Sequence, residues 1–429
     1  MSTVLSAVPY ADGSGPNTGR VVLHADLNNF FASVECHDNP SLAEKPVAVC
    51  GDPEKRHGIV LAKNELAKRY GVTTGEPIFR AKAKCPSLLT VPARYDRYMY
   101  FSRGVREIYR RYTDRVEPFG MDEAWLELTE NREVKSIADG AKTADEIRKA
   151  VYAEFGITLS VGVSDNKVFA KLGSDYKKPD AVTVFSSREY ETIIARLPIS
   201  EILFAGAATT ARLRSFGLLT VGQVAESSPY FIKSILGKNG LTLRRYCRGE
   251  DESRVAFFGQ CAPIKSMSNS TTPPRDITDF AMAKQILSSL CDTVCSRLRA
   301  ENLKCGGVGL HLRDTALRCS ERLCTLEKPI SCARDMLKVA MRLLHENVDL
   351  RTTPLRSIGV RATALSGAEK EPQLSLFSEN TAKRDILDRT TDMLRKRYGD
   401  GILRTAFDLC DTDGAAQIER GYEVFTHVR

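Results

Sequence analysis

The sequence of 429 residues has no segment that would place it in a membrane. Its apolar runs all fall short of the roughly 18 residues that a membrane helix needs. Residues 1–19 are rich in Ser, Gly, Pro and Asn, and they lack the basic start and apolar core of a signal peptide. We therefore expect a disordered leader and no contact with a membrane.

Cysteine is present, but without the spacings that metal or disulfide chemistry would suggest. None of the 12 cysteines belongs to a Cys-x-x-Cys pair, and the nearest pairs have no His at a matching spacing. Scattered cysteines are typical of small buried hydrophobes in a reducing compartment. We expect no zinc, no disulfide and a cytoplasmic location.

A strong excess of one charge is also missing, since the net charge is +8. The charge is unevenly distributed: residues 254–366 hold 17 Lys and Arg against 10 Asp and Glu. Such a stretch is either an ordinary solvated surface or a nucleic-acid-binding domain, and composition alone leaves both open.

What the sequence does contain is a pair of adjacent acids, Asp122 and Glu123, just after Gly120. Residues 123–128 alternate, with apolar side chains at the even positions, which predicts a strand with one buried face. In a regular strand the two acids point to opposite faces, so both reach one cation only if the chain bends, and Gly120 permits a bend. Most lone Asp-Glu pairs are solvated surface.

A second acidic motif ends the apolar stretch 21–26 at Asp26, and the adjacent aromatics Phe30 and Phe31 follow. An acid at the end of a core strand is costly to bury unless it is paired or bound to a metal. Three carboxylates on two strands are the smallest protein set that holds two Mg²⁺ around a phosphate.

The two motifs together resemble those of the Y-family (lesion-bypass) DNA polymerases, most closely the bacterial polymerase IV branch. Members of that family have a strand that ends in Asp before two aromatics, and a Ser-Ile-Asp-Glu-Ala-Phe-Leu-Asp-like hairpin. The resemblance covers about residues 21–361, with the motifs in the family's order. It implies an error-prone, translesion, DNA-directed DNA polymerase without proofreading, which acts on primer-template DNA and dNTP as a monomer.

The resemblance also implies an α/β and α+β multidomain fold, the right-hand polymerase. The expected parts are a palm (20–29 and 94–185), fingers (30–93), a helix-hairpin-helix thumb (186–252), a linker (253–262), an α+β little finger (263–364) and a tail (365–429) with a C-terminal helix. In the palm, a helix over 166–176 is expected to bring Lys167, Lys171, Lys177 and Lys178 together.

The family's metal site maps onto the acids named above. By resemblance, Asp26 and Asp122 bridge two Mg²⁺ ions, and Glu123 binds the ion nearest the primer. The backbone carbonyl of Leu27 completes the shell of the nucleotide-side ion.

The nucleotide site maps onto the residues after Asp26. Phe31 occupies the position of the steric gate, where a bulky ring excludes a 2′-hydroxyl group. Asn29 and Phe30 belong to the same nucleotide-binding stretch, and Phe30 packs either into the palm or under the nascent base pair. The alternative for both rings is a core pair on one helix.

The triphosphate contacts depart in part from the family. Lys178 matches a triphosphate-binding lysine. The family's Tyr-x-x-Arg of the fingers is replaced by Glu65 and Lys68, so Lys68 supplies a point charge rather than a fork. Glu65 is expected to pair with Lys68 or Lys63, and Asn64 to take over a hydrogen bond to the nucleotide.

DNA contacts are expected from the thumb and the little finger. The first thumb hairpin keeps Gly206, but Phe204 and Ala207 stand where the family has another glycine and a proline, and a plain helical thumb is the alternative. The little-finger candidates of the resemblance are basic residues that meet phosphates. They are Lys265, Arg297, Arg299, Arg313, Arg318, Arg322, Arg356 and Arg361.

The tail contains Gln373-Leu374-Ser375-Leu376-Phe377, which matches the bacterial sliding-clamp (β clamp) motif Gln-Leu-x-Leu-Phe at every specified position. Large apolar groups in polar surroundings are typical anchors for a partner groove. We therefore predict that Gln373, Leu374, Leu376 and Phe377 bind the clamp. The alternative is a strand packed on the little finger.

Three other functions are alternatives to a polymerase IV-type enzyme. A non-catalytic DNA-binding accessory protein would have lost a metal carboxylate, and all three are present. A nucleotidyl cyclase would need neither the thumb hairpin nor the basic domain. The sequence does not distinguish a polymerase IV-type enzyme from a polymerase V catalytic-subunit-like protein, which needs partner subunits.

Overall fold

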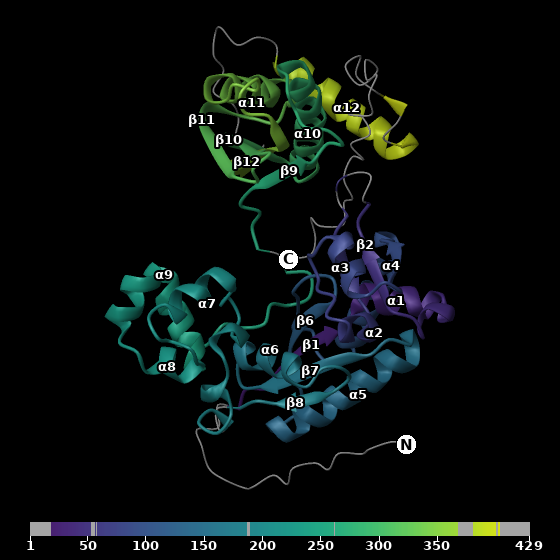
Figure 1. The fold of residues 1–429 in the computed structure, drawn as a ribbon, viewed down its shortest axis with the longest axis vertical. Helices are drawn as coiled ribbons and strands as arrows, with labels where there is room; N and C mark the ends of the chain where they lie inside the picture. Colours follow the sequence, from purple (N-terminus) through teal and green to yellow (C-terminus); the bar gives the residue numbers. More distant parts are fainter. Residues whose placement is uncertain are drawn as a thin grey trace. The chain divides into compact units, whose positions relative to one another are not determined.

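The computed structural model describes residues 19–52, 56, 58–186, 189–260, 262–367, 381–399 and 402–403 (Figure 1). The chain divides into two compact units: the first holds residues 19–50 and 60–260, and the second holds residues 51–52, 56, 58–59 and the described residues after 261. The expected palm and thumb and most of the expected fingers fall in the first unit, and the expected little finger falls in the second. Within these residues, no helix has both the length and the apolar character needed to cross a membrane.

The palm is a five-stranded sheet of mixed direction. Its order is β5 (Val116–Pro118), β6 (Glu123–Glu127), β1 (Val22–Leu27), β7 (Leu159–Ser164) and β8 (Val182–Val184). Only the β7–β8 pair is parallel. The helices α5 (Ile137–Phe155) and α6 (Lys167–Tyr176) cover the sheet. Gly140 of α5 lies against Val163, and Gly162 lies against α6, so the two helices cover opposite faces.

Strand β6 is buried on both faces, so the prediction of a single buried face is wrong. Glu127 and Leu126 are both 0% exposed, and Trp125 is 4% exposed. The reason is tertiary: β6 is an interior strand, and Trp125 packs on His24 of β1 with its ring Nε1 donating to the Lys167 carbonyl of α6. The polar residues of the alternating pattern, Glu123 and Glu127, therefore face ion-pair partners inside the protein and not solvent.

The fingers are a small subdomain between β1 and the β6 hairpin. The elements are α1 (Phe30–Asp38), the 3₁₀ helix η1 (Pro40–Leu42), β2 (Val47–Cys50), β3 (Val60–Lys63), α2 (Glu65–Arg69), α3 (Ile78–Lys84) and β4 (Leu89–Pro92). The strands form a sheet in the order β3-β2-β4. The long helix α4 (Tyr95–Arg110) then returns the chain to the palm.

The thumb contains helices and turns, as expected. Its elements are η3 (Ile194–Arg196), η4 (Ile199–Glu201), α7 (Ala207–Arg214), α8 (Val221–Glu226) and α9 (Pro229–Cys247). Phe204 has φ of 69°, the left-handed conformation that glycine adopts without strain. The turn before α7 thus keeps a glycine-like backbone although the side chain is large.

The stretch after the thumb is bound to the palm by a network around the buried carboxylate of Glu127. That carboxylate accepts hydrogen bonds from Arg20 Nε at 3.3 Å, from Arg254 Nη1 and from the Val255 amide at 3.1 Å. The Phe258 amide also donates to the Asp114 carbonyl at 2.9 Å. The start of the predicted linker is therefore fixed to the palm by hydrogen bonds.

The second unit is a four-stranded sheet with helices on it. The sheet order is β11 (Cys319–Ile330), β10 (Leu303–Asp314), β12 (Leu355–Gly367) and β9 (Met267–Thr271). Helices α10 (Phe280–Ala300) and α11 (Ala333–Asn347) pack on it, and α12 (Thr381–Tyr398) packs on α10. Figure 1 shows α12 beside α10, in yellow.

One DNA-binding candidate of this unit differs from its prediction. Arg299 is 7% exposed and forms ion pairs with Asp388 and Asp392 of α12, so it holds that helix and is not free to meet phosphates. A register shift between Arg313 and Asp314 places Leu355 with Ile358 in the core, and Arg356 is half-buried.

Candidate active site

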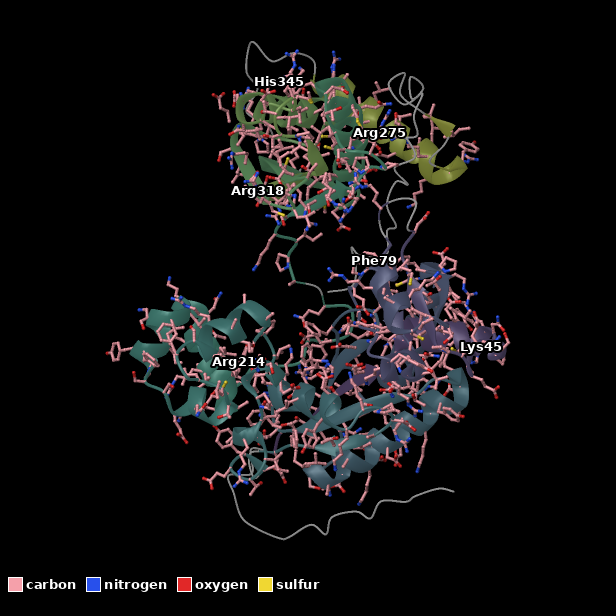
Figure 2. All side chains as sticks on the ribbon, viewed as in Figure 1. Lys45, Phe79, Arg214, Arg275, Arg318 and His345 are labelled. Atoms are coloured by element: carbon pink, nitrogen blue, oxygen red, sulfur yellow. The ribbon has the colours of Figure 1, made fainter. Side chains whose placement is uncertain are left out.

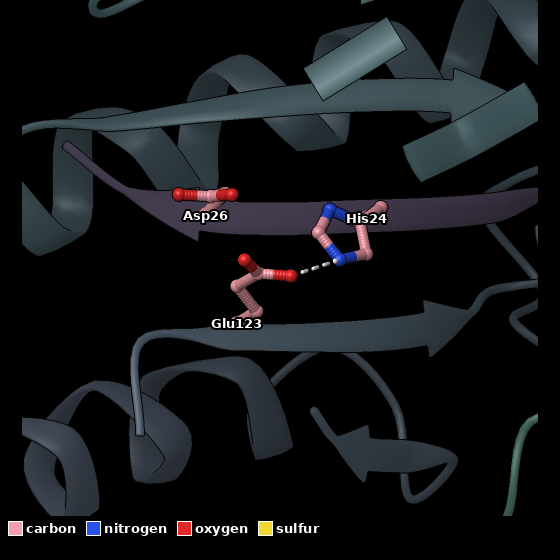
Figure 3. A group of neighbouring side chains, drawn as sticks. All are labelled: His24, Asp26 and Glu123. Carbon is pink, nitrogen blue, oxygen red and sulfur yellow. Dashed lines mark ion pairs between the residues drawn. The ribbon is translucent and has the colours of Figure 1, made fainter. Parts of the chain in front are cut away.

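The site begins with two acids placed opposite each other on neighbouring strands. Asp26 of β1 is the cross-strand partner of Glu123 of β6, and directly opposed residues of an antiparallel pair share one face. His24, two residues before Asp26, lies on the same face. Figure 3 shows these side chains together, with His24 Nε2 3.3 Å from Glu123 Oε2.

The third acid, Asp122, precedes the strand in a bend. Gly120 has φ of 91°, which confirms the expected turn in the chain at this point. Helix α4 holds the bend: Ser102 Oγ donates to the Met121 carbonyl at 2.5 Å, and Arg106 donates to the Gly120 carbonyl at 2.7 Å. The Leu27 amide donates to the Asp122 carbonyl at 3.0 Å, which ties the bend to the end of β1.

Two lysines from α6 and the turn after it meet these acids. Lys171 Nζ lies 3.0 Å from Asp26 Oδ2 and 3.0 Å from Glu123 Oε2. Lys178 Nζ lies 2.7 Å from the same Asp26 oxygen, and both ammonium groups also contact Asp175. Of the four lysines expected to converge, only Lys171 and Lys178 do so, because Lys167 pairs with Glu117 and Lys177 is exposed.

The close approach of α6 to the sheet explains how Lys171 reaches β1. A Cβ on Gly162 of β7 would collide with the backbone of Ala170 and Ser174. A Cβ on Gly173 would lie 3.1 Å from Gly162 Cα, which is also a tight contact. Only glycines allow this spacing, so these two residues position the lysine over the acids.

Burial and neighbouring charges shift the pKa values of the three acids. Burial raises the pKa of Asp122 to about 6, and the charges of Asp26 and Glu123 add to the effect. Burial also raises the pKa of Asp26, although Lys171 and Lys178 oppose it. Burial would raise the pKa of Glu123 too, but the hydrogen bond with His24 and the charge of Lys171 outweigh it and lower the pKa.

These residues fit a divalent cation. Carboxylate oxygens are the ligands that Mg²⁺ prefers, and Asp26 and Glu123 offer them from opposed positions on two strands. One ligand atom each from His24, Asp26 and Glu123 lies within 4.8 Å of the others. Sequence reasoning did not assign roles to His24, Lys171 and Asp175, since no motif marks contacts made across the sheet.

Phe31, the predicted gate residue, packs on a tyrosine that is itself held by hydrogen bonds. The Phe31 ring stacks on Tyr98 of α4, with centroids 4.2 Å apart and planes at 10°. Tyr98 Oη donates to Glu35 at 2.6 Å, and Arg94 holds Glu35 by two further hydrogen bonds. Phe30 is 3% exposed, which supports the core-packing alternative rather than contact with a nucleotide.

The fingers residues differ in how far they are free for a triphosphate. The Asn64 amide caps α2 at the Ala67 amide and also bonds Val47 and Lys45, so its predicted nucleotide contact is not supported. Glu65 pairs with Lys68 at 3.5 Å, as expected, and accepts a hydrogen bond from Asn29 at 3.0 Å. The Lys68 side chain is 52% exposed.

The DNA-binding candidates are spread over both units. Gly206 is the N-cap of α7, and a Cβ there would meet nothing within 4 Å, so neither space nor backbone requires a glycine. Lys265 is exposed just before β9, whereas Arg313 and Arg356 are half-buried. Arg318, labelled in Figure 2, is 80% exposed but paired with Asp314. The clamp motif lies outside the described residues.

The fold and the site together define a right-hand nucleotidyl-transfer enzyme of the polymerase type. The defining features are acids on adjacent palm strands, small fingers, a helical thumb and a separate α+β unit. Sequence comparison agrees. Residues 25–175 match the impB/mucB/samB family, and residues 264–376 match its C-terminal domain.

Relatives with assigned names cover almost the whole chain. DNA polymerase IV of Acetivibrio thermocellus is 44% identical over 382 residues, which cover 89% of this chain and 95% of the relative. DNA polymerase IV 1 of Bacillus subtilis is 33% identical and covers 91% of this chain and 93% of the relative.

A Y-family DNA polymerase chimera has a similar fold, with a TM-score of 0.72 at 25% identity over 81% of this chain and 99% of that one. The chain belongs to the Y-family DNA polymerases and, within them, to the polymerase IV branch.

Proposed function

We propose that this protein is an error-prone translesion DNA polymerase that extends a primer by two-metal-ion nucleotidyl transfer. The observation that carries the proposal is the pairing of Asp26 with Glu123 across two palm strands, where their ligand atoms lie close enough to share a metal ion. The charges of both acids also raise the pKa of Asp122, which supports its place beside them. A polymerase V-like protein that needs partner subunits gains no support from any contact described above.

The proposed roles are those that the family resemblance implies. Two Mg²⁺ ions would lower the pKa of the primer 3′-hydroxyl and stabilise the leaving pyrophosphate. Asp26 and Asp122 would bridge the two ions, Glu123 would hold the primer-side ion, and the Leu27 carbonyl would complete the nucleotide-side shell. Lys178, whose side chain is 27% exposed, would exchange its contact with Asp26 for the triphosphate.

The test is primer extension by the purified protein alone, with Mg²⁺, on undamaged and abasic templates. Solo synthesis on both templates supports the polymerase IV function. Synthesis that appears only with added partner subunits would favour the polymerase V-like alternative.

The gate role of Phe31 is supported by its packing on Tyr98. Because Tyr98 and Glu35 fix the ring, Phe31 is held rigid enough to test sugar shape rather than yield to a 2′-hydroxyl. Asn29, two residues before Phe31, donates to Glu65 at 3.0 Å, and Lys68 would add a positive charge for the triphosphate.

The grip on DNA is proposed to come from the thumb and the little finger. The backbone at Gly206 would meet a phosphate, and Lys265, Arg313 and Arg356 would meet others. Because such contacts release counterions, affinity for primer-template should fall steeply with salt. Deleting residues 263–364 should weaken DNA binding and processivity while some single-nucleotide insertion remains. Unchanged affinity after the deletion would contradict the proposal.

The tail is proposed to tether the enzyme to the sliding clamp through Gln373, Leu374, Leu376 and Phe377. A tether raises the effective concentration of a weakly bound polymerase at the primer. Mutating Leu376 and Phe377 to Ala should abolish clamp-stimulated synthesis and leave clamp-free insertion near normal. A double mutant that binds the clamp with wild-type affinity would refute the tether. The cytoplasmic location and the monomeric state stay predictions.

A further inference from the structure

Lys171 lies where a cation contacts two of the acids at once. Its Nζ is 3.0 Å from Asp26 Oδ2 and 3.0 Å from Glu123 Oε2. Ligand atoms of His24, Asp26 and Glu123 are close enough to share a metal ion. The chain therefore places its own ammonium group at carboxylate oxygens that also suit a divalent ion.

The ammonium group is enclosed by acids. The Lys171 side chain is only 14% exposed, and its third partner is Asp175, 3.2 Å away. Three carboxylates within 3.2 Å of Nζ therefore compensate the charge that the fold encloses.

Lys178 makes a different set of contacts. It reaches Asp26 and Asp175, and its side chain is 27% exposed. Lys171 is the deeper of the two and is the one that also contacts Glu123. The family resemblance gives Lys178 to the triphosphate, which leaves the charge of Lys171 inside the acid cluster.

We propose that Lys171 is a built-in counter-ion of the primer-side metal site. It holds Asp26 and Glu123 in place while no divalent ion is bound, and it competes with that ion for Glu123 Oε2. Asp175 gives the ammonium group a second partner to retain when the ion takes Glu123. This inference rests on the proposed metal-binding role of Asp26 and Glu123.

Two opposite effects follow from removing the charge. Without Lys171 the carboxylates repel each other with less compensation, so the metal-free protein becomes less stable. The divalent ion then meets no competing positive charge, so it binds more tightly. A lysine that served only to pack α6 on the sheet would lower stability without raising metal affinity.

The test uses full-length protein without DNA or nucleotide. Free Mn²⁺ is measured by electron paramagnetic resonance during a titration at fixed ionic strength, and the thermal midpoint is measured in chelator. For Lys171→Met we expect binding of the tightest Mn²⁺ to strengthen about tenfold and the metal-free midpoint to fall. Lys171→Arg, which keeps the charge, should retain wild-type affinity.

Matched controls separate the possible outcomes. Lys167→Met removes an equally enclosed lysine one turn earlier, paired with Glu117, and should leave Mn²⁺ affinity unchanged. If Lys171→Met does not fold, Lys171→Gln provides the same loss of charge with a polar side chain. Mn²⁺ binding that is no tighter in the uncharged variants would overturn the counter-ion role. Wild-type binding in Glu123→Gln would instead overturn the proposed metal site itself.

Discussion

The two ends of strand β6 bury carboxylates in opposite ways. At its C-terminal end, Glu127 is 0% exposed and has Arg20, Arg254 and the Val255 amide as partners. Burial alone would raise the pKa of Glu127, but these hydrogen bonds and charges outweigh burial and lower it. The carboxylate is fully compensated by groups that the fold holds in place.

At the N-terminal end of β6, compensation is incomplete. Lys171 and Lys178 contact Asp26, and Lys171 also contacts Glu123, whose pKa is lowered. Burial nevertheless raises the pKa of Asp26, and it raises the pKa of Asp122 to about 6. Lysine is a point charge on a flexible stem, whereas arginine is a planar fork that keeps its proton. The contrast teaches that a buried acid with permanent partners stabilises the fold, while acids with exchangeable partners leave room for a cation.

The largest expected effect comes from changing Asp122, at the N-terminal end of β6, where charge compensation is incomplete. Asp122→Ala should lower primer extension by about a thousandfold or more, because a metal ligand supplies several kcal/mol to the transition state. Affinity for primer-template should stay near wild type. Stability should not fall, since one of three mutually repelling acids is gone. Rates come from single-nucleotide insertion and affinity from fluorescence anisotropy.

Asp122→Asn serves as the matched control, because it removes the charge and keeps the shape. It should be as inactive as Asp122→Ala. Primer extension that survives either change would end the metal assignment, and the comparison between the two ends of β6 would then fail.

The second effect comes from changing Glu127, at the C-terminal end of β6. Glu127→Ala should lower the free energy of unfolding by about 3 kcal/mol, because it leaves the largely enclosed guanidinium group of Arg20 without its carboxylate partner. Insertion per folded molecule should persist. Urea denaturation followed by circular dichroism gives the first quantity, and active-site titration gives the second. A stable but inactive Glu127→Ala protein would show that this end is catalytic as well.

A third change adds a residue that acts through shape rather than charge. Phe31→Ala should reduce discrimination against ribonucleotides by about ten- to a hundredfold, since the void under the sugar then admits a hydroxyl group. The concentration of Mg²⁺ needed for half-maximal rate should not change. The measurement is the ratio of kcat/KM for dNTP and rNTP. An unchanged ratio would assign the gate elsewhere.

The smallest effect concerns a charge that is neither buried nor fixed. Lys68 is half-exposed and pairs with Glu65 at 3.5 Å, so its attraction for a triphosphate is screened by solvent. Lys68→Ala should raise the apparent nucleotide KM about two- to fivefold with little change in kcat. Steady-state kinetics at low salt measures both. Equal KM values would show that Lys68 is only a surface residue.

Local sequence patterns predict the order of the palm elements and the acids of the candidate site. An apolar run that ends at Asp26 and an alternating run after Asp122 predict two palm strands, because strand periodicity is a local property of the chain. Gly120 marked the bend for the same reason.

Tertiary structure alone decided what those acids meet. Nothing local to Glu127 says that Arg20 and Val255 will enclose it, and nothing local to Lys171 says that it will sit between Asp26 and Glu123. Both outcomes depend on the sheet order and on α6 lying against β7 at Gly162. Burial, and with it the pKa of every acid in the palm, depends on such long-range packing, so identical carboxylates on one strand become a structural anchor at one end and a cation site at the other.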